Sequence, residues 1–327
     1  MTTGVDEQET RSLSLLTVAV AVAVAGAAAV GAALHWAAVS EGAHRVVAAD
    51  GEWLAVAAAV ACLTWVSGTS MQLGVVSVRP PVLRLFAVQV AGSFMNHLLP
   101  AGFGGLAVNV RFLRRLGMTR EAALASQALN ASAGAVTHLA LFAIAWAFAP
   151  AALRDAASAG FDRVENLVLT GVAVALVLGV VLVVTRRVHW RGPGPVARLT
   201  AGAVAEYRAL AAVTGDPRRA AQLWSGALAL PVVHTLVLFA VLNAVGTPLP
   251  IGVVLPVYLG ASAVSSVIPS PGGAGSLDVA LAAALVLAGL PVTAAVGALV
   301  AYRFLTVWVP FLPGACTLGV LLKRRIV

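Results

Sequence analysis

Sixty per cent of the 327 residues are hydrophobic and only 10% are charged, which gives a mean hydropathy of +0.95. Soluble domains carry about one-quarter charged residues, so this composition excludes an ordinary soluble fold. The formal net charge is +8. In a chain this apolar, we expect that charge to mark one membrane face rather than a nucleic-acid-binding surface.

The chain opens with a short tail at residues 1–12, which we predict to be cytoplasmic. An apolar run of about 26 residues follows at 13–38. It is too long for the apolar region of a secretion signal, and the acidic residues Asp6, Glu7 and Glu9 precede it. We therefore interpret this run as a retained membrane span.

Six apolar stretches are long enough to cross a bilayer, since a core of about 30 Å needs about 20 residues of helix. They are residues 13–38, 53–78, 121–149, 164–185, 220–245 and 292–322. Two more apolar stretches are interrupted by Pro/Gly-rich segments at 98–105 and 268–275, through which a helix cannot continue. The sequence predicts an all-α integral membrane protein with six transmembrane helices plus two re-entrant or broken helical hairpins.

The order of two spans, a hairpin and a span occurs twice, and the second copy starts from the opposite side of the membrane. Such inverted repeats with broken helices are typical of secondary transporters. The predicted organisation places the first repeat and the first helix of the second at 13–185. A cytoplasmic linker with an amphipathic helix follows at 186–219, then the rest of the second repeat at 220–322 and a basic cytoplasmic tail at 323–327.

Basic residues set the expected orientation. In this topology, 17 of the 21 Lys and Arg residues fall on one side of the membrane and three on the other, with Arg303 inside a span. The positive-inside rule then makes both termini cytoplasmic. The Ala, Val and Arg bias with a single lysine suggests a bacterial chain, so we expect a multi-pass protein of the bacterial inner membrane.

The two breaks are the first candidate binding region. New helices near Leu106 and Ser276 would direct free N–H groups and the positive end of the helix dipole into the protein. The glycines of the breaks allow close approach of a ligand to the backbone, which suits a phosphate or carboxylate. The alternative is that these glycines only permit tight hairpins and close helix packing.

Ionisable residues at membrane depth are the second signal. Asp278 is the only acidic residue inside a predicted membrane segment away from a water-facing end, and such groups are costly and usually functional. Arg303 is its expected counter-ion. The alternative is that Asp278 complements the first turn of its helix while Arg303 balances it structurally.

Further polar residues surround the first break. Asn96 and His97 precede it, while Asn109 and Arg111 follow it. Arg111 is positioned either to bind a phosphate or to extend to the membrane interface. For Asn130, His138 and His234, which lie within full spans, we expect interhelical hydrogen bonds, with proton coupling as the alternative.

The motifs at both breaks resemble the lysylphosphatidylglycerol synthase transmembrane (flippase-like) family. They are Ile-Pro-Ser-Pro-Gly-Gly-Ala-Gly-Ser-Leu-Asp ending at Asp278, Ala-Tyr-Arg ending at Arg303, Pro-Ala-Gly-Phe-Gly-Gly ending at Gly105, and Arg111. The resemblance implies a domain that moves lipids between leaflets. Family members commonly have glutamate where Asp278 stands and a Glu-Arg pair near Asn130. The chain ends without a soluble aminoacyl-transferase domain, so we expect that it does not make lysyl lipid itself.

The sequence thus predicts a flippase-like transporter for a lipid or lipid-linked anionic substrate, without catalytic residues, metal or cofactor. The predicted substrate-binding residues are Asn96, His97, Pro100, Gly102, Gly104, Gly105, Asn109, Arg111, Ser266, Pro269, Gly272, Gly273, Gly275, Asp278, Tyr302 and Arg303.

Two other functions stay open from the sequence. One is a non-transporting scaffold for a separate lipid-modifying or cell-envelope enzyme. The other is an intramembrane enzyme, for which Ser265, Ser266 and Ser270 are the only loose candidates. The identity of the lipid, the direction and energy source of transport and the oligomeric state do not follow from the sequence.

Overall fold

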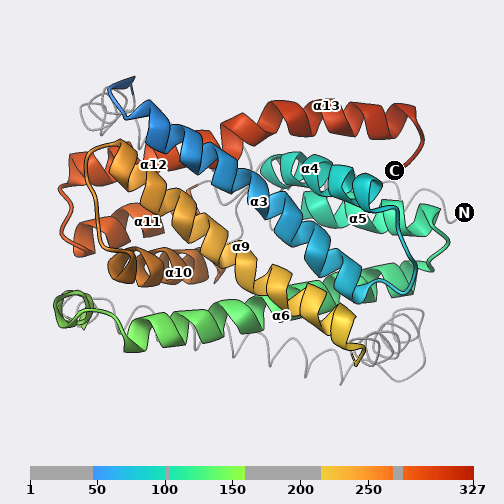
Figure 1. Cartoon of the computed structure of the whole chain (residues 1–327), viewed down its shortest axis with the longest axis horizontal. Coiled ribbons are helices and arrows are strands. Elements are labelled where there is room, and N and C mark those ends of the chain that lie inside the picture. The colour runs from blue at the N-terminus through green and yellow to red at the C-terminus, as the bar shows by residue number, and fades with distance from the viewer. Residues whose placement is uncertain (1–46, 100–102, 159–214, 268–274) are drawn as a thin grey trace, which may run out of the picture.

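A computed structural model describes residues 47–99, 103–158, 215–267 and 275–327 (Figure 1). Within these ranges the regular secondary structure is helical. The predicted spans at 13–38 and 164–185, most of the linker at 186–219, and the breaks at 100–102 and 268–274 lie outside the described residues.

The helices follow the order expected from the apolar pattern. They are α3 (Gly51–Val75), α4 (Val82–Leu98), α5 (Phe103–Arg115), α6 (Arg120–Ala147), α9 (Pro217–Ala244), α10 (Ile251–Val267), α11 (Ser276–Leu287), α12 (Val292–Arg303), the π-helix η1 (Phe304–Trp308) and α13 (Val309–Lys323).

Four helical segments are long and apolar enough to cross a membrane: Gly51–Val75, Arg120–Ala147, Pro217–Ala244 and Val292–Lys323. Each coincides with a predicted span, so the all-helical, multi-pass prediction is confirmed for this part of the chain. The last of them differs in detail, because the π-helical turn η1 interrupts the single α-helix that we expected.

Polar residues at the helix starts explain several boundaries. The side chain of Asp50 accepts the N–H of Glu52 at 2.8 Å, and Thr119 accepts that of Ala122 at 3.1 Å. Such N-caps satisfy donors that have no partner inside the helix. They place the starts of α3 and α6 within a few residues of the predicted span boundaries.

Both predicted breaks interrupt the helix. Leu99, after α4, has an extended backbone, and Gly275, before α11, has a φ of 91°. In each half the two short helices flanking the break pack against each other, α4 on α5 and α10 on α11. With 12 to 17 residues, these helices are shorter than the about 20 residues that a full crossing needs.

The long helices α3 and α9 run antiparallel through the middle of the molecule (Figure 1). At one end the N–H of Asp50 donates to the carbonyl of Ala244 at 2.9 Å. Further along, Gly226 of α9 lies directly against the carbonyl of Ser67 in α3. Small residues at such contacts let two backbones approach closely, which is how membrane helices pack.

The two hairpins pack against helices from the other half of the chain. The helix α13 lies on α4 of the first hairpin, and α6 lies on α10 of the second. One buried apolar cluster therefore surrounds the first hairpin and another surrounds the second. The halves are interleaved rather than side by side.

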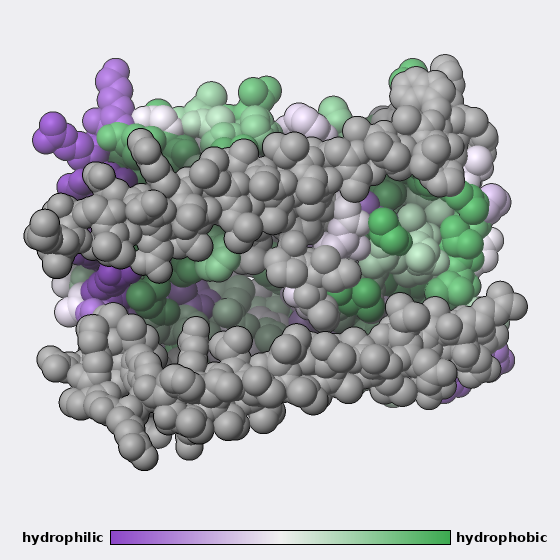
Figure 2. Space-filling model, turned by 180° about the vertical axis from the view of Figure 1, so that it is seen from behind, coloured by the Kyte–Doolittle hydropathy of each residue, from purple (hydrophilic) through white to green (hydrophobic). Residues whose placement is uncertain are grey.

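Basic residues gather at one end of the molecule. Figure 2 shows hydrophilic surface mainly at its left edge, which corresponds to the end of Figure 1 where α13 terminates. The starts of α4, α6 and α9 and the ends of α5 and α13 carry Arg84, Arg120, Arg218, Arg115 and Lys323. The asymmetry predicted from the sequence is thus present among the described residues.

Candidate functional site

The start of α11 is organised by one glycine and one carboxylate. Gly275 has a φ of 91°, a conformation that costs a glycine little and other residues considerably more. Its N–H donates to the Oδ2 atom of Asp278 at 2.8 Å. Asp278 is thereby fixed in the first turn of α11, where a negative charge is favoured by the helix dipole.

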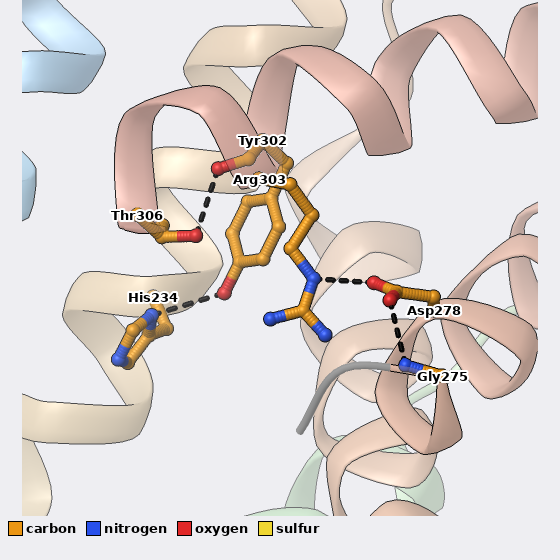
Figure 3. Close-up of polar contacts among 6 residues, drawn as sticks. All are labelled: His234, Gly275, Asp278, Tyr302, Arg303 and Thr306. Atoms are coloured by element: carbon orange, nitrogen blue, oxygen red, sulfur yellow. Dashed lines mark hydrogen bonds and ion pairs between the residues drawn. The ribbon is translucent and has the colours of Figure 1, made fainter. Parts of the chain in front are cut away.

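The second oxygen of Asp278 forms an ion pair with Arg303 at the end of α12 (Figure 3). The Nε atom of Arg303 donates to Oδ1 of Asp278. The Arg303 side chain is 15% exposed and that of Asp278 is 30% exposed, so the pair is reachable from outside the protein core. The predicted pairing of these two residues is confirmed.

The π-helix η1 begins immediately after Arg303. Within this wider turn, the hydroxyl of Thr306 donates to the carbonyl of Tyr302 at 2.8 Å (Figure 3). Single π-helical turns inside membrane and soluble helices occur frequently at functional sites. The π-turn therefore directly follows Arg303, the one arginine that the sequence places inside a span.

A buried aromatic layer lies behind the ion pair. The Tyr302 hydroxyl is hydrogen-bonded to Nδ1 of His234 at 3.0 Å, and the ring of His234 stacks on Tyr258 at 5.8 Å. Tyr302 and Tyr258 are 1% and 6% exposed. This layer ties α9, α10 and α12 together and supports the helix turn that carries Arg303.

We expect Tyr302→Phe to destabilise this layer. The change leaves Nδ1 of His234 without its partner in a buried position, which costs about 1–3 kcal/mol. Thermal unfolding in detergent micelles measures the effect. Thr306→Val, which removes only a local bond to a carbonyl, is the matched control and should cost less.

The tip of the first hairpin is held together by its glycines. A Cβ atom on Gly104 would lie 2.0 Å from the carbonyl oxygen of Met95, so only glycine fits there. The N–H of Gly105 donates to Oδ1 of Asn96 at 2.6 Å. Close helix packing, the alternative to ligand binding for these glycines, therefore accounts for Gly104 and Gly105.

The expectation of free N–H groups at both helix starts is wrong at two positions. The N–H of Gly105 is taken by Asn96, and the N–H of Gly275 is taken by Asp278. Side chains of the chain itself thus occupy donors that we had assigned to a ligand. The charged atoms of the site are supplied by Arg303 and Asp278 instead.

His97 lies at the end of α4, next to the tip of the first hairpin. Its Nδ1 atom is buried and has no hydrogen-bond partner among the described residues. The positive charge of Arg303 is close enough to act electrostatically on His97, and also on His234.

Sequence reasoning missed a network of side-chain amides around the first hairpin. Oε1 of Gln72 accepts from Asn130 at 2.6 Å and from Gln127 at 3.1 Å, while Gln89 donates to Asn109 at 2.9 Å. The presence of glutamines inside apolar spans was the sequence signal that could have revealed this network. Asn130 thus forms the interhelical bond expected of it.

The remaining predicted residues are spread more widely. Arg111 is exposed on α5 and lines a cavity of about 510 Å³ with Arg114 and Arg115. Ser266 is exposed and its hydroxyl donates to the carbonyl of Ala263. Pro100, Gly102, Pro269, Gly272 and Gly273 lie outside the described residues.

His138 in α6 donates from Nε2 to the carbonyl of Leu259 in α10 at 3.0 Å. This is the interhelical bond that we expected of His138, and His234 likewise bonds across to α12. Among the described residues, no group of three or more His, Cys, Asp or Glu side chains converges as a metal site would require.

Comparison with known protein families identifies the family of this chain. The sequence model of the family described as the lysylphosphatidylglycerol synthase TM region matches residues 7–314 of the 327. The match covers both hairpins and the ion pair. A search of curated proteins finds no match to the chain.

Proposed function

Because this chain belongs to the family of lysylphosphatidylglycerol synthase transmembrane regions, we propose that it is a flippase-like transporter of a lipid or lipid-linked anionic substrate. The family places it among membrane proteins related to lipid metabolism. The proposed activity is movement of the substrate between leaflets, and we propose that the chain acts without catalysing a reaction.

The Asp278–Arg303 pair is the observation that carries this proposal. An arginine guanidinium binds phosphate as readily as carboxylate, through the same planar donors. A lipid phosphate that reaches the partly exposed pair can replace Asp278 as the partner of Arg303. While the phosphate is bound, Asp278 keeps the N–H of Gly275 and the favourable end of the α11 dipole. When the phosphate leaves, Asp278 pairs with Arg303 again, so Arg303 has an anionic partner in both states.

The environment of Arg303 fits a headgroup held between the two hairpins. His97 presents a buried Nδ1 atom from the first hairpin, and Arg303 acts on it electrostatically. A headgroup between these residues would contact both halves of the chain. Its acyl chains would stay in the bilayer, so only the polar group needs a protein-lined path.

The packing of the helices supports an inverted repeat. In each half, a long helix is followed by two short helices, a break between them and another long helix. Each hairpin packs against a long helical segment of the other half, because α13 packs on the first hairpin and α6 packs on the second. We propose that alternating access arises when one repeat moves against the other around the central pair α3 and α9.

We further propose that the basic end of the molecule faces the cytoplasm of a bacterial cell, with the chain in the inner membrane. The gathering of basic side chains at one end supports this orientation (Figure 2). A separate lipid-modifying enzyme is the partner that such a transporter would serve.

Two of the serines that an intramembrane enzyme would use are not arranged for catalysis. The hydroxyls of Ser265 and Ser266 donate to backbone carbonyls, an arrangement that does not activate a nucleophile.

The test is leaflet-resolved exchange of labelled lipids in proteoliposomes. We expect the purified protein to accelerate exchange of phosphatidylglycerol more than that of phosphatidylcholine, because Arg303 pairs with a headgroup whose net charge is negative. Protein-free vesicles give the background rate. Equal acceleration of both lipids would contradict an anion-selective path, and no acceleration of either would favour the scaffold function.

A further inference from the structure

A second candidate region lies at the basic end of the molecule, away from the ion pair. An open cavity of about 430 Å³ lies between the start of α4 and the end of α13. Its lining is mainly apolar, with two arginines. The lining residues are Leu83, Arg84, Ala87, Val320, Leu321, Arg324 and Ile326.

The chain shapes this cavity by a turn that ends α13. Arg325 has a φ of 54°, a left-handed conformation that is uncommon for a residue with a side chain. The N–H of Ile326 donates back to the carbonyl of Leu321 at 2.9 Å. The turn thereby directs Ile326 into the cavity wall and leaves the Arg324 side chain at the cavity.

The charges of the cavity have no protein partner in the part of the chain described. Neither the Arg84 guanidinium nor that of Arg324 forms an ion pair with another described residue. Both side chains are exposed. Two cations beside an apolar hollow are complementary to a phosphate ester attached to hydrocarbon.

We propose that this cavity binds one anionic phospholipid from the surrounding leaflet, with its phosphate between Arg84 and Arg324 and the upper part of an acyl chain along Ala87, Val320 and Ile326. The ligand is a resident lipid and not the transported one. Arg84 lies thirteen residues before His97 on α4, which is about 20 Å along the helix axis.

Such a lipid would join the two halves of the chain. Arg84 belongs to α4 of the first hairpin, whereas Arg324 follows α13 at the end of the second half. Binding would therefore favour the arrangement in which α4 and α13 are packed together. Through this resident lipid, the stability of that arrangement would depend on the fraction of anionic lipid in the membrane.

The experiment compares lipid-dependent stability in nanodiscs. The wild type is placed in discs of phosphatidylcholine with increasing phosphatidylglycerol, and the unfolding temperature is recorded. The test variant is Arg84→Gln/Arg324→Gln. The control is Arg114→Gln/Arg115→Gln, which removes the same charge from α5 without touching this cavity.

We expect phosphatidylglycerol to raise the Tm of the wild type and of the control. The test variant should need roughly tenfold more phosphatidylglycerol for the same rise, since each basic side chain near an anionic surface strengthens binding severalfold. Ala87→Trp, which fills the cavity and keeps both arginines, should weaken the response as well.

Three results would overturn the proposal. One is a wild type whose Tm does not rise as phosphatidylglycerol replaces phosphatidylcholine in the discs. Another is a control that loses the response as fully as the test variant, because the effect would then reflect total surface charge. The third is a full response in Ala87→Trp, which would show that no acyl chain enters the cavity. None of these depends on lipid exchange between leaflets.

Discussion

Asp278→Asn and Arg303→Gln should change lipid binding in opposite directions. Asp278 occupies Arg303 in the resting protein, so its neutralisation removes the competitor of an incoming phosphate. We expect phosphatidylglycerol to bind about tenfold more tightly to Asp278→Asn. Exchange between leaflets should nevertheless slow, because the lipid must leave Arg303 without a carboxylate to replace it.

Arg303→Gln should lose the lipid bound at the ion pair, and exchange with it, while the lipid between Arg84 and Arg324 stays bound. Arg303→Lys keeps the charge but lacks the planar donors that pair with phosphate, so it should retain only part of both activities. Native mass spectrometry measures lipid retention and labelled vesicles measure exchange. If Asp278→Asn binds less lipid than the wild type, the exchange of partners at Arg303 is the wrong mechanism.

A substitution at the contact between α3 and α9 should greatly reduce stability. A Cβ atom on Gly226 would lie 2.6 Å from the carbonyl oxygen of Ser67 and 2.8 Å from the backbone nitrogen of Met71. Rigid backbone atoms cannot move aside without separating the two central helices. We expect Gly226→Ala to reduce the free energy of unfolding by about 3 kcal/mol.

Gly319→Ala is the matched control for Gly226→Ala. Gly319 also lies inside a helix, α13, and an added Cβ there meets nothing within 4 Å. Alanine favours the helix over glycine by about 1 kcal/mol, so this change should be neutral or stabilising. Unfolding in mixed detergent micelles measures both variants, and equal effects would contradict the close contact of α3 and α9.

Much of the architecture was predictable from the sequence because the bilayer sets the length of each apolar segment. The spans beginning near Trp53, Glu121 and Ala220 agree with α3, α6 and α9 to within a few residues. Both breaks were predictable for a similarly local reason, since proline and glycine end a helix whatever surrounds it. The inverted repeat remains a prediction.

The polar site was only partly predictable. Asp278 and Arg303 stood out because each is a charge in an apolar stretch, and two opposite charges there are expected to pair. The role of Asn96 did not follow, because the bond to Gly105 depends on how the hairpin closes. The amide network of Gln72 was missed because neutral glutamines do not change the hydropathy of a span enough to attract notice.

The π-helical turn after Arg303 could not be expected from the sequence either. Phe304 to Trp308 are ordinary residues for a membrane helix, and nothing in their pattern distinguishes a π-turn from an α-turn. Tyr302, at the end of α12 just before the turn, bonds to His234 on α9. This contact joins distant parts of the chain, and the sequence does not reveal it.

The most direct test of lipid transport through the ion pair is the initial rate of phosphatidylglycerol exchange between leaflets. It should be measured in proteoliposomes holding equal amounts of folded wild type, Arg303→Gln or Arg114→Gln. We predict that the wild type and Arg114→Gln exchange lipid well above protein-free vesicles, while Arg303→Gln falls to the background rate. Wild-type exchange by Arg303→Gln would contradict the proposed path.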